Sequence, residues 1–202
     1  MAGLAMNENK PGLILLAMLL LGLVSACSQQ PEAPPLAGAA LGGPFTLTDQ
    51  NGKSVSEPAY TGQYRLIYCG YTYCPDVCPV DLQSLAHGLR QFEEEAPERA
   101  AKVQPIFITT DPQRDTPAVL KDYVAAFHPR LIGLTGSPQQ IAAVARKYGV
   151  AYSRRDDAGA SDYLVDHSRI ALLFGPEGEP IAIIPQDQGA AAIAAELERW
   201  VR

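Results

Sequence analysis

The fold of this chain is decided at Tyr68-Cys69-Gly70-Tyr71-Thr72-Tyr73-Cys74-Pro75-Asp76-Val77-Cys78-Pro79, where a hydrophobic strand passes through two cysteines into a helix. Cys74 and Cys78 are four residues apart, so a helical turn would place both sulfurs on one side. Pro79 suits the first position of a helix because it has no N–H to leave unpaired, which predicts Cys78 as the N-cap. The positive end of the helix dipole favours a thiolate there, the form of cysteine that binds metals and attacks disulfides.

The chain on both sides of this segment alternates between strand and helix patterns. Apolar runs predict strands over residues 64–71, 103–109, 131–134, 150–153, 167–174 and 180–184, and Asn51-Gly52 predicts a hairpin within residues 44–55. Helical spacing predicts helices after Pro79, Pro117 and Pro138 and over residues 190–201. The polar residues 154–166 are interpreted as an excursion from the core.

This order predicts an α/β fold, with a thioredoxin-like mixed sheet, helices on both faces and an N-terminal β-hairpin. The cysteine loop follows the strand over residues 64–71. Functional groups of open α/β sheets gather at the carboxyl ends of the strands, so this loop is the expected site.

The first 43 residues differ from the rest of the chain. Residues 13–24 carry no charge, but the run is short for a bilayer span, which needs about 20 apolar residues, so we interpret residues 1–26 as an export signal. Val24-Ser25-Ala26-Cys27 is similar to a bacterial lipobox, which predicts lipidation of Cys27; an uncleaved membrane anchor is the alternative. Residues 27–43, rich in Pro, Ala and Gly, are the expected linker, and residues 44–202 the domain. The expected location is the periplasmic side of a bacterial membrane, with the N-terminus tethered to it.

Charge and sulfur content narrow the possible partners. The net charge of −6 and the absence of basic clusters argue against nucleic acid. All three methionines precede Cys27, so a cleaved chain would offer no thioether ligand. It would keep Cys69, Cys74 and Cys78, one more cysteine than a pair needs.

Three chemistries use two cysteines in such a loop. Thiol–disulfide exchange prefers two residues between the cysteines, whereas Cys74 and Cys78 are separated by three. Peroxide reduction would use one thiolate. Metal binding would use both thiolates, which select Cu(I), Zn(II) or iron–sulfur clusters, and a further ligand such as an imidazole.

The sequence offers three histidines as that further ligand. His87 is expected on the surface of the helix after the cysteines, and His128 precedes Pro129 as a helix-end cap. His167 begins the predicted strand 167–174 after the long polar segment, which could bring it over the cysteines, although a turn residue bonded to backbone is the alternative. Asp166 could orient its imidazole. Cys69 lies within the strand and is expected to pack as a small hydrophobe.

Four motifs in order resemble the Sco (SenC) proteins: Tyr71-Thr72-Tyr73-Cys74-Pro75-Asp76-Val77-Cys78-Pro79, Asp111-Pro112-Gln113-Arg114-Asp115-Thr116-Pro117, Phe127-His128-Pro129-Arg130-Leu131-Ile132-Gly133-Leu134-Thr135-Gly136 and Tyr163-Leu164-Val165-Asp166-His167-Ser168. The likeness covers about residues 45–201. It departs from the family pattern at Cys69, where relatives usually have phenylalanine, so Cys69 could form a wrong disulfide. The family is also commonly anchored by a transmembrane helix rather than by a lipid.

The resemblance implies a thioredoxin-fold copper metallochaperone that helps to load the dinuclear copper site of cytochrome c oxidase. Carried over from the family, the ligands of one copper ion are Cys74, Cys78 and His167. The implied partners are the copper-accepting oxidase subunit and a thiol reductant protein, and no catalytic turnover is expected.

Two enzymatic readings stay open beside it. In the first, Cys74 and Cys78 are the redox pair of a periplasmic thiol–disulfide reductase that keeps the acceptor's cysteines reduced. Such reductases usually have a cis-proline before the strand that faces the cysteines, and Ser168-Arg169-Ile170-Ala171 contains no proline. In the second, a peroxiredoxin-like enzyme would use a single cysteine.

Overall fold

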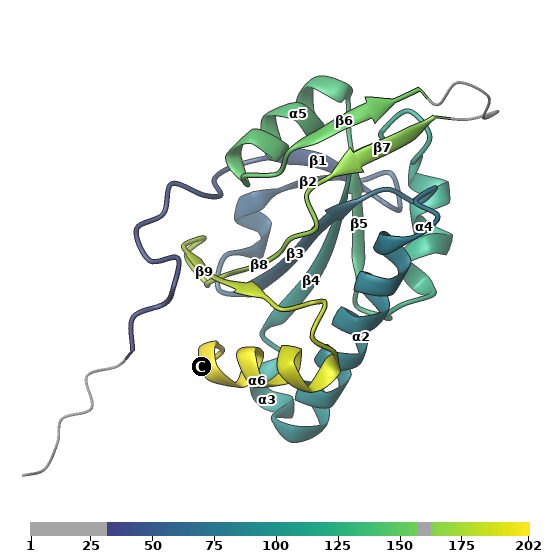
Figure 1. Cartoon of the computed structure of the whole chain (residues 1–202). Coiled ribbons are helices and arrows are strands. Elements are labelled where there is room, and N and C mark those ends of the chain that lie inside the picture. Colours follow the sequence, from purple (N-terminus) through teal and green to yellow (C-terminus); the bar gives the residue numbers. More distant parts are fainter. Residues whose placement is uncertain (1–31, 157–162) are drawn as a thin grey trace, which may run out of the picture. The chain divides into compact units, whose positions relative to one another are not determined.

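A computed structural model describes residues 32–156 and 163–202 (Figure 1). Residues 34–202 form one compact unit. Its elements are β1 (Thr46–Asp49), β2 (Ser54–Ser56), the 3-10 helix η1 (Glu57–Tyr60), β3 (Tyr64–Gly70), α2 (Val77–Glu95), α3 (Pro97–Ala100), β4 (Val103–Thr109), α4 (Pro117–Ala125), β5 (Ile132–Thr135), α5 (Pro138–Lys147), β6 (Tyr152–Arg155), β7 (Leu164–His167), β8 (Ala171–Phe174), β9 (Pro180–Ile184) and α6 (Ala190–Trp200).

Seven strands form one mixed sheet in the order β2-β1-β5-β4-β3-β8-β9. The central strands β3, β4 and β5 run parallel to one another, and β1 and β8 join them antiparallel. Figure 1 shows β3 inside this sheet, between β4 and β8, and α2 follows β3 along the chain. The predicted thioredoxin-like mixed sheet with an N-terminal hairpin is confirmed.

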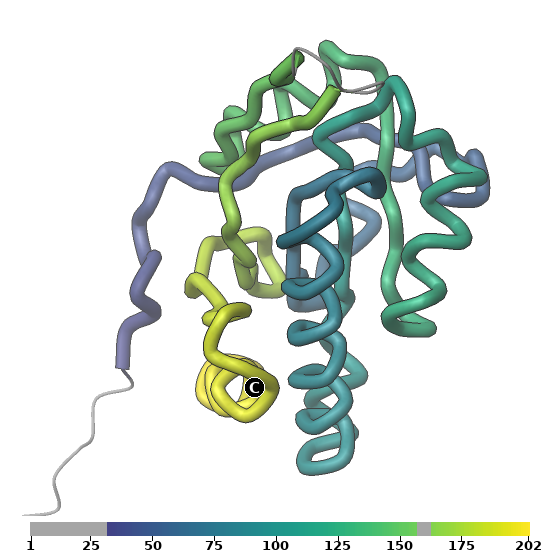
Figure 2. The backbone as a smooth tube through the Cα atoms, turned by 45° about the vertical axis from the view of Figure 1, so that its right-hand side comes forward, coloured from purple at the N-terminus to yellow at the C-terminus, as the bar shows by residue number. Residues whose placement is uncertain are grey.

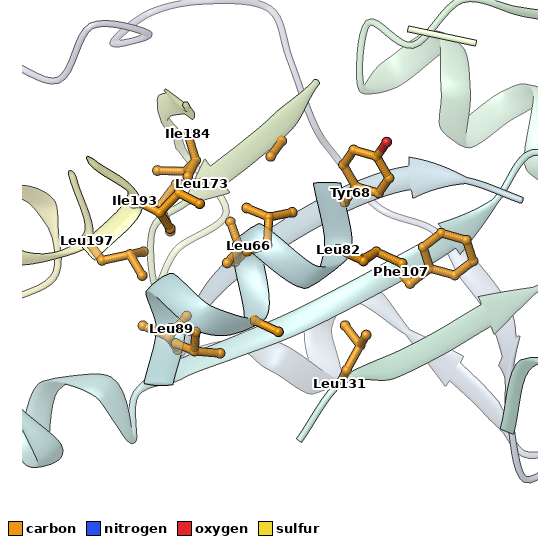
Figure 3. Packing of buried hydrophobic residues seen from close by; sticks show 14 of the residues in the cluster. Leu66, Tyr68, Leu82, Leu89, Phe107, Leu131, Leu173, Ile184, Ile193 and Leu197 are labelled. Atoms are coloured by element: carbon orange, nitrogen blue, oxygen red, sulfur yellow. The ribbon is translucent and has the colours of Figure 1, made fainter. Parts of the chain in front are cut away.

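Helices cover β3 on both faces, which explains why its residues, apolar except for Arg65, are all buried. Leu66 and Tyr68 point into a core formed with α2, α4 and α6, whereas Ile67 and Cys69 point into a second core formed with α5. Figure 3 shows the first core, with Leu66 among side chains of α2, β8 and α6.

The helices α2 and α6 pack closely against each other on the face of the sheet that carries the first core (Figure 2). A Cβ atom at Gly88 of α2 would lie 2.5 Å from Cβ of Ile193 in α6. Glycine at position 88 therefore permits a close contact between α2 and α6, whereas any larger residue would push the two helices apart.

The capping signals place the other helices as expected. The Thr116 hydroxyl accepts a hydrogen bond from the Val119 amide before α4, and Ser137 and Gln140 form a complete capping box before α5. Each signal precedes a proline in the first turn, so local sequence alone determines where these helices begin.

The predicted excursion over residues 154–166 is partly wrong, because its two ends are strands. β6 and β7 pair antiparallel in a separate two-stranded sheet, with Tyr152 opposite His167. Polar residues are tolerated here because Ser153, Arg154 and Arg155 are exposed. His167 therefore ends β7, and residues 168–170 separate it from β8, in place of one strand over residues 167–174.

The second half of the predicted linker contacts the domain. The Leu36 amide donates to the Ile181 carbonyl (3.0 Å), and the Gly42 amide donates to the Lys147 carbonyl (2.8 Å). Leu36 and Leu41 also pack against the second core. Contacts of the domain thus begin before the expected boundary at Pro44.

The predicted export signal and Cys27 lie outside the described residues. Among residues 32–156 and 163–202, no helix has both the length and the apolar character needed to cross a membrane.

Candidate metal centre

Cys74, Cys78 and His167 come together at the carboxyl end of β3. Their two Sγ atoms and one imidazole nitrogen all lie within 4.8 Å of one another. The Sγ atom of Cys78 is 3.1 Å from Nε2 of His167. The cysteines come from the start of α2 and the loop before it, whereas the histidine comes from the end of β7, 89 residues after Cys78. Three such donor atoms, this close together, could hold one metal ion.

The helix begins two residues earlier than the sequence predicted. Asp76 is the N-cap of α2, so Cys78 is its second residue and Pro79 its third, and the prediction of Cys78 as the N-cap is wrong. The amide of Cys78 donates to Sγ of Cys74 at 3.4 Å, so the first cysteine accepts one of the unpaired N–H groups of the first turn. Pro79 fits there because every amide of that turn lacks a partner within the helix.

The prediction that the helix dipole favours a thiolate at Cys78 is also wrong for the metal-free chain. The Cys78 side chain is completely buried, and burial raises the pKa of its thiol well above the ordinary value. Near a helix N-terminus the dipole contributes about 0.3–1 kcal/mol, too little to offset the loss of water around the sulfur anion. The thiol is therefore protonated, and a bound metal would displace its proton.

The imidazole of His167 is held with one nitrogen facing the cysteines. Its Nδ1–H donates to the carbonyl oxygen of Ser168 (3.1 Å), which leaves the lone pair of Nε2 directed at Cys78. Tyr68 and Tyr71 enclose the ring edge to face, with centroids at 6.4 and 5.9 Å. Burial lowers the pKa of His167, so the ring is neutral and able to act as a ligand.

Asp166 does not orient the imidazole as expected. Its carboxylate points toward Arg155, with an N–O distance of 3.3 Å, and the Ser168 carbonyl takes the expected role. Adjacent side chains of a strand point to opposite faces, so Asp166 and His167 diverge.

The other two histidines lie elsewhere, as predicted. The exposed His87 contacts Gln83 on α2 (2.7 Å), and the buried His128 contacts Glu93 (3.3 Å). Neither belongs to the group formed by Cys74, Cys78 and His167.

Cys69 lies on the opposite face of β3 from the site. It packs among Ile67, Ile106 and other residues of the second core, and burial raises the pKa of its thiol to about 12. The sheet therefore separates Cys69 from Cys78, which belongs to the first core. This placement opposes the wrong disulfide that the sequence left possible.

Gly70 is a site residue that the sequence reasoning missed. A Cβ atom there would lie 2.7 Å from Sγ of Cys78, too close for any side chain. Glycine inside a buried strand is itself a signal that another group approaches closely, so this residue could have been found.

A buried carboxylate fixes the start of the cysteine loop. Asp115 accepts hydrogen bonds from the Thr72 amide (3.0 Å), the Thr72 hydroxyl (2.5 Å) and the Thr109 hydroxyl (2.6 Å). Burial nevertheless raises the pKa of Asp115. The loop is thereby tied to the end of β4, the neighbouring strand of the sheet.

Comparisons with known proteins agree on one family. A family model described as SCO1/SenC matches residues 33–202. The chain is 41% identical over 167 residues to the mitochondrial protein SCO2 of Saccharomyces cerevisiae, covering 80% of this chain and 54% of the relative. It is 45% identical over 146 residues to the mitochondrial SCO1 homolog 1 of Arabidopsis thaliana, covering 72% of this chain and 42% of the relative. The chain thus spans about half the length of these curated relatives.

Solved structures support the same relationship. The structure of Bradyrhizobium japonicum ScoI with copper bound matches with a TM-score of 0.72 and 40% sequence identity. The match covers 80% of this chain and 100% of that one.

The predicted periplasmic location with a lipid tether is wrong on these comparisons. The matching proteins of yeast, Arabidopsis, cattle and humans are mitochondrial. A SCO2-like protein of the bacterium Rickettsia felis also matches. Short apolar segments near an N-terminus occur in several kinds of targeting signal, and the four residues around Cys27 were too weak a pattern to choose among them.

Proposed function

The chain belongs to the SCO1/SenC family, and we propose that it is a copper metallochaperone. It binds one copper ion through Cys74, Cys78 and His167 and delivers the ion to the dinuclear copper site of cytochrome c oxidase. The observation that carries this proposal is the convergence of two sulfurs and one imidazole nitrogen within 4.8 Å. Solved relatives described as copper-bound support it.

The donor set suits copper in its reduced form. Two soft thiolates and one neutral imidazole match the ligands that Cu(I) prefers, and three ligands leave the ion open to a fourth. The site lies along an open groove lined by Tyr71, Cys74, Leu164 and His167. An acceptor protein entering this groove could add its own ligand before the three donors release the ion.

Each ligand has a distinct role in the transfer. The buried Cys78 holds the ion deepest in the fold, and the half-buried Cys74 lies nearer the groove. His167 contributes a neutral ligand that can leave without taking a proton from its surroundings. The partners are the copper-accepting oxidase subunit and a thiol reductant protein that returns Cys74 and Cys78 to the dithiol form.

The reductase reading would depend on Cys74. Burial raises the pKa of Cys78 and keeps its proton in place, so the half-buried Cys74 would have to supply the attacking thiolate of thiol–disulfide exchange. The two sulfurs still lie close enough together to oxidise, so the chain needs a reductant partner under either reading.

Copper binding by the reduced chain, measured under argon against a competing Cu(I) chelator, tests the proposal. We expect one ion per chain, and we expect His167→Ala to weaken binding at least about tenfold, about 1.4 kcal/mol. Loss of the imidazole leaves a two-sulfur site with an open position. The disulfide needs only Cys74 and Cys78, so oxidation of the dithiol should remain intact.

His87→Ala is the matched control, because His87 lies outside the group formed by Cys74, Cys78 and His167. Weak binding that His167→Ala leaves unchanged would reject the proposal.

Cu(I) affinity should also rise with pH. The raised pKa of Cys78 means that its proton is still bound at neutral pH and must leave when the metal binds. Loss of that one proton contributes about a tenfold gain in apparent affinity per pH unit below the thiol pKa. Competition titrations at pH 6, 7 and 8, corrected for the protonation of the chelator, measure the slope. An affinity independent of pH would contradict this expectation.

A further inference from the structure

An ion pair joins the two parts of the chain that carry the metal ligands. Arg169 presents its guanidinium edge to Asp81 of α2, with Nη2 2.6 Å from Oδ1 and Nε 3.1 Å from Oδ2. This two-point geometry fixes orientation as well as distance, unlike a contact through a single hydrogen bond. Asp81 is 1% exposed, so the pair is anchored inside the protein.

Asp81 is also held from the sheet. The Tyr68 hydroxyl of β3 donates to Oδ2 of Asp81 at 2.8 Å. Tyr68 is itself fully buried, and its ring packs beside that of His167. The carboxylate is therefore a rigid acceptor, fixed before Arg169 binds to it.

The backbone of Arg169 is fastened as well. Its carbonyl oxygen accepts a hydrogen bond from Nε2 of Gln186 at 2.9 Å. The side chain and the main chain of this residue are thus both held, which limits how far residues 167–169 can move.

The ion pair lies very near the ligands in sequence. Asp81 follows Cys78 by three residues and therefore lies on the same side of α2. Arg169 follows Ser168, the residue whose carbonyl accepts the Nδ1–H of His167. Because His167 ends β7 outside the seven-stranded sheet, that sheet does not itself fix the imidazole relative to α2.

We propose that Arg169 and Asp81 are positioning residues, whose ion pair holds the His167 imidazole beside the Cys78 sulfur. This inference rests on the proposed copper site and specifies what aligns its third ligand. Neither residue touches the metal in this account. They act through His167, so removing their contact should matter only while His167 is present.

A double-mutant cycle on the reduced full chain separates positioning of the His167 imidazole from a general loss of charge or stability. We expect Arg169→Met to weaken Cu(I) binding about tenfold, about 1.4 kcal/mol, in the chelator competition. In the His167→Ala background the same change should alter affinity less than about twofold, because the ligand that it positions is gone. Equal losses in both backgrounds would show an effect of charge or stability and would overturn the proposal.

Two further variants control for charge and for folding. Arg155→Met also removes a cation paired with an aspartate near His167, but that partner, Asp166, lies on the same two-stranded sheet and not on α2. Arg155→Met should leave affinity unchanged. Arg169→Lys keeps a cation beside Asp81 and protects the fold, but it loses the two-point contact, so its affinity should lie between those of the wild type and Arg169→Met.

A readout without copper keeps this inference distinct from the proposed function. In the metal-free chain, NMR of ¹⁵N-labelled histidine reports the tautomer of His167 and its shielding by Tyr68 and Tyr71. We expect Arg169→Met to move the His167 ring signals toward solvent-exposed values, with Arg155→Met leaving them in place. If the wild type fails to bind copper while these signals move, positioning stands and the copper proposal fails. Unmoved signals in Arg169→Met would overturn positioning, whatever the metal binding shows.

Discussion

Cys78→Ser is expected to lower Cu(I) affinity at least about a thousandfold, or about 4 kcal/mol. Cys78 is completely buried, and its sulfur lies 3.1 Å from the His167 nitrogen, at the meeting point of the ligands. A serine hydroxyl is a hard donor that keeps its proton, so it cannot replace a soft thiolate toward Cu(I). Chelator competition on the reduced variant measures the loss, and non-reducing thiol titration should show that Cys74 no longer oxidises within the chain.

The matched control for this variant is Cys69→Ala. Cys69 is also a buried cysteine, but it lies in the core on the other face of β3. Removing its sulfur should cost some packing and leave copper affinity and oxidation of the dithiol unchanged. Comparable copper losses in both variants would mean that Cys78 acts through the core, contrary to its proposed role as a ligand.

Gly70→Ala should damage the site without removing any ligand. The new methyl group would lie 2.7 Å from Sγ of Cys78 and 3.2 Å from Cε1 of Tyr68. The sulfur must move, and the start of α2 with it, so we expect Cu(I) affinity to fall at least about a hundredfold, about 2.8 kcal/mol. Overpacking at a buried position should also lower the free energy of unfolding by about 1–3 kcal/mol. Urea unfolding and chelator competition on the same preparation measure the two effects.

Gly133→Ala separates these two effects. Its methyl group would lie 3.0 Å from Cγ1 of Val124 and 3.2 Å from Cβ of Leu120, so it crowds α4 and leaves the cysteines untouched. We expect lower stability with unchanged copper affinity. A similar loss of affinity in this variant would assign the effect of Gly70→Ala to stability alone.

Local signals in the sequence were sufficient to predict most of the fold. The alternation of buried strands and capped helices predicted the central sheet, and Ser137 and Thr116 marked helix starts that the structure confirms. These features depend on contacts between residues close in sequence, where spacing determines geometry. The strand predicted over residues 150–153 overlaps β6, but β7 and its pairing with β6 were missed. Exposed strands tolerate polar residues and lose the apolar alternation on which prediction depends.

The site was harder to predict from residue patterns. The spacing of Cys74 and Cys78 indicated two neighbouring sulfurs that could bind one ion or form one disulfide. Spacing alone could not select His167 as a ligand, and the resemblance to the Sco proteins did so. The protonation of Cys78 and the contact between Asp81 and Arg169 depend on tertiary burial and on residues 88 positions apart. No local sequence pattern indicates the burial of Cys78 or the contact between Asp81 and Arg169. For this reason a thiolate was expected at Cys78, and the ion pair was not predicted.

The long separation of the ligands along the chain has a consequence for unfolding. Two ligands lie on one short segment and the third follows 89 residues after Cys78, so the complete site exists only in the folded chain. A bound ion would then act as a removable cross-link between the first and last parts of the domain. At a free ion concentration a hundred times the Kd, such selective binding stabilises the folded state by about 2.7 kcal/mol, less whatever the unfolded dithiol retains. The metal-loaded chain should therefore outlast the empty one under heat or protease, and it should lose that advantage when the ion is removed.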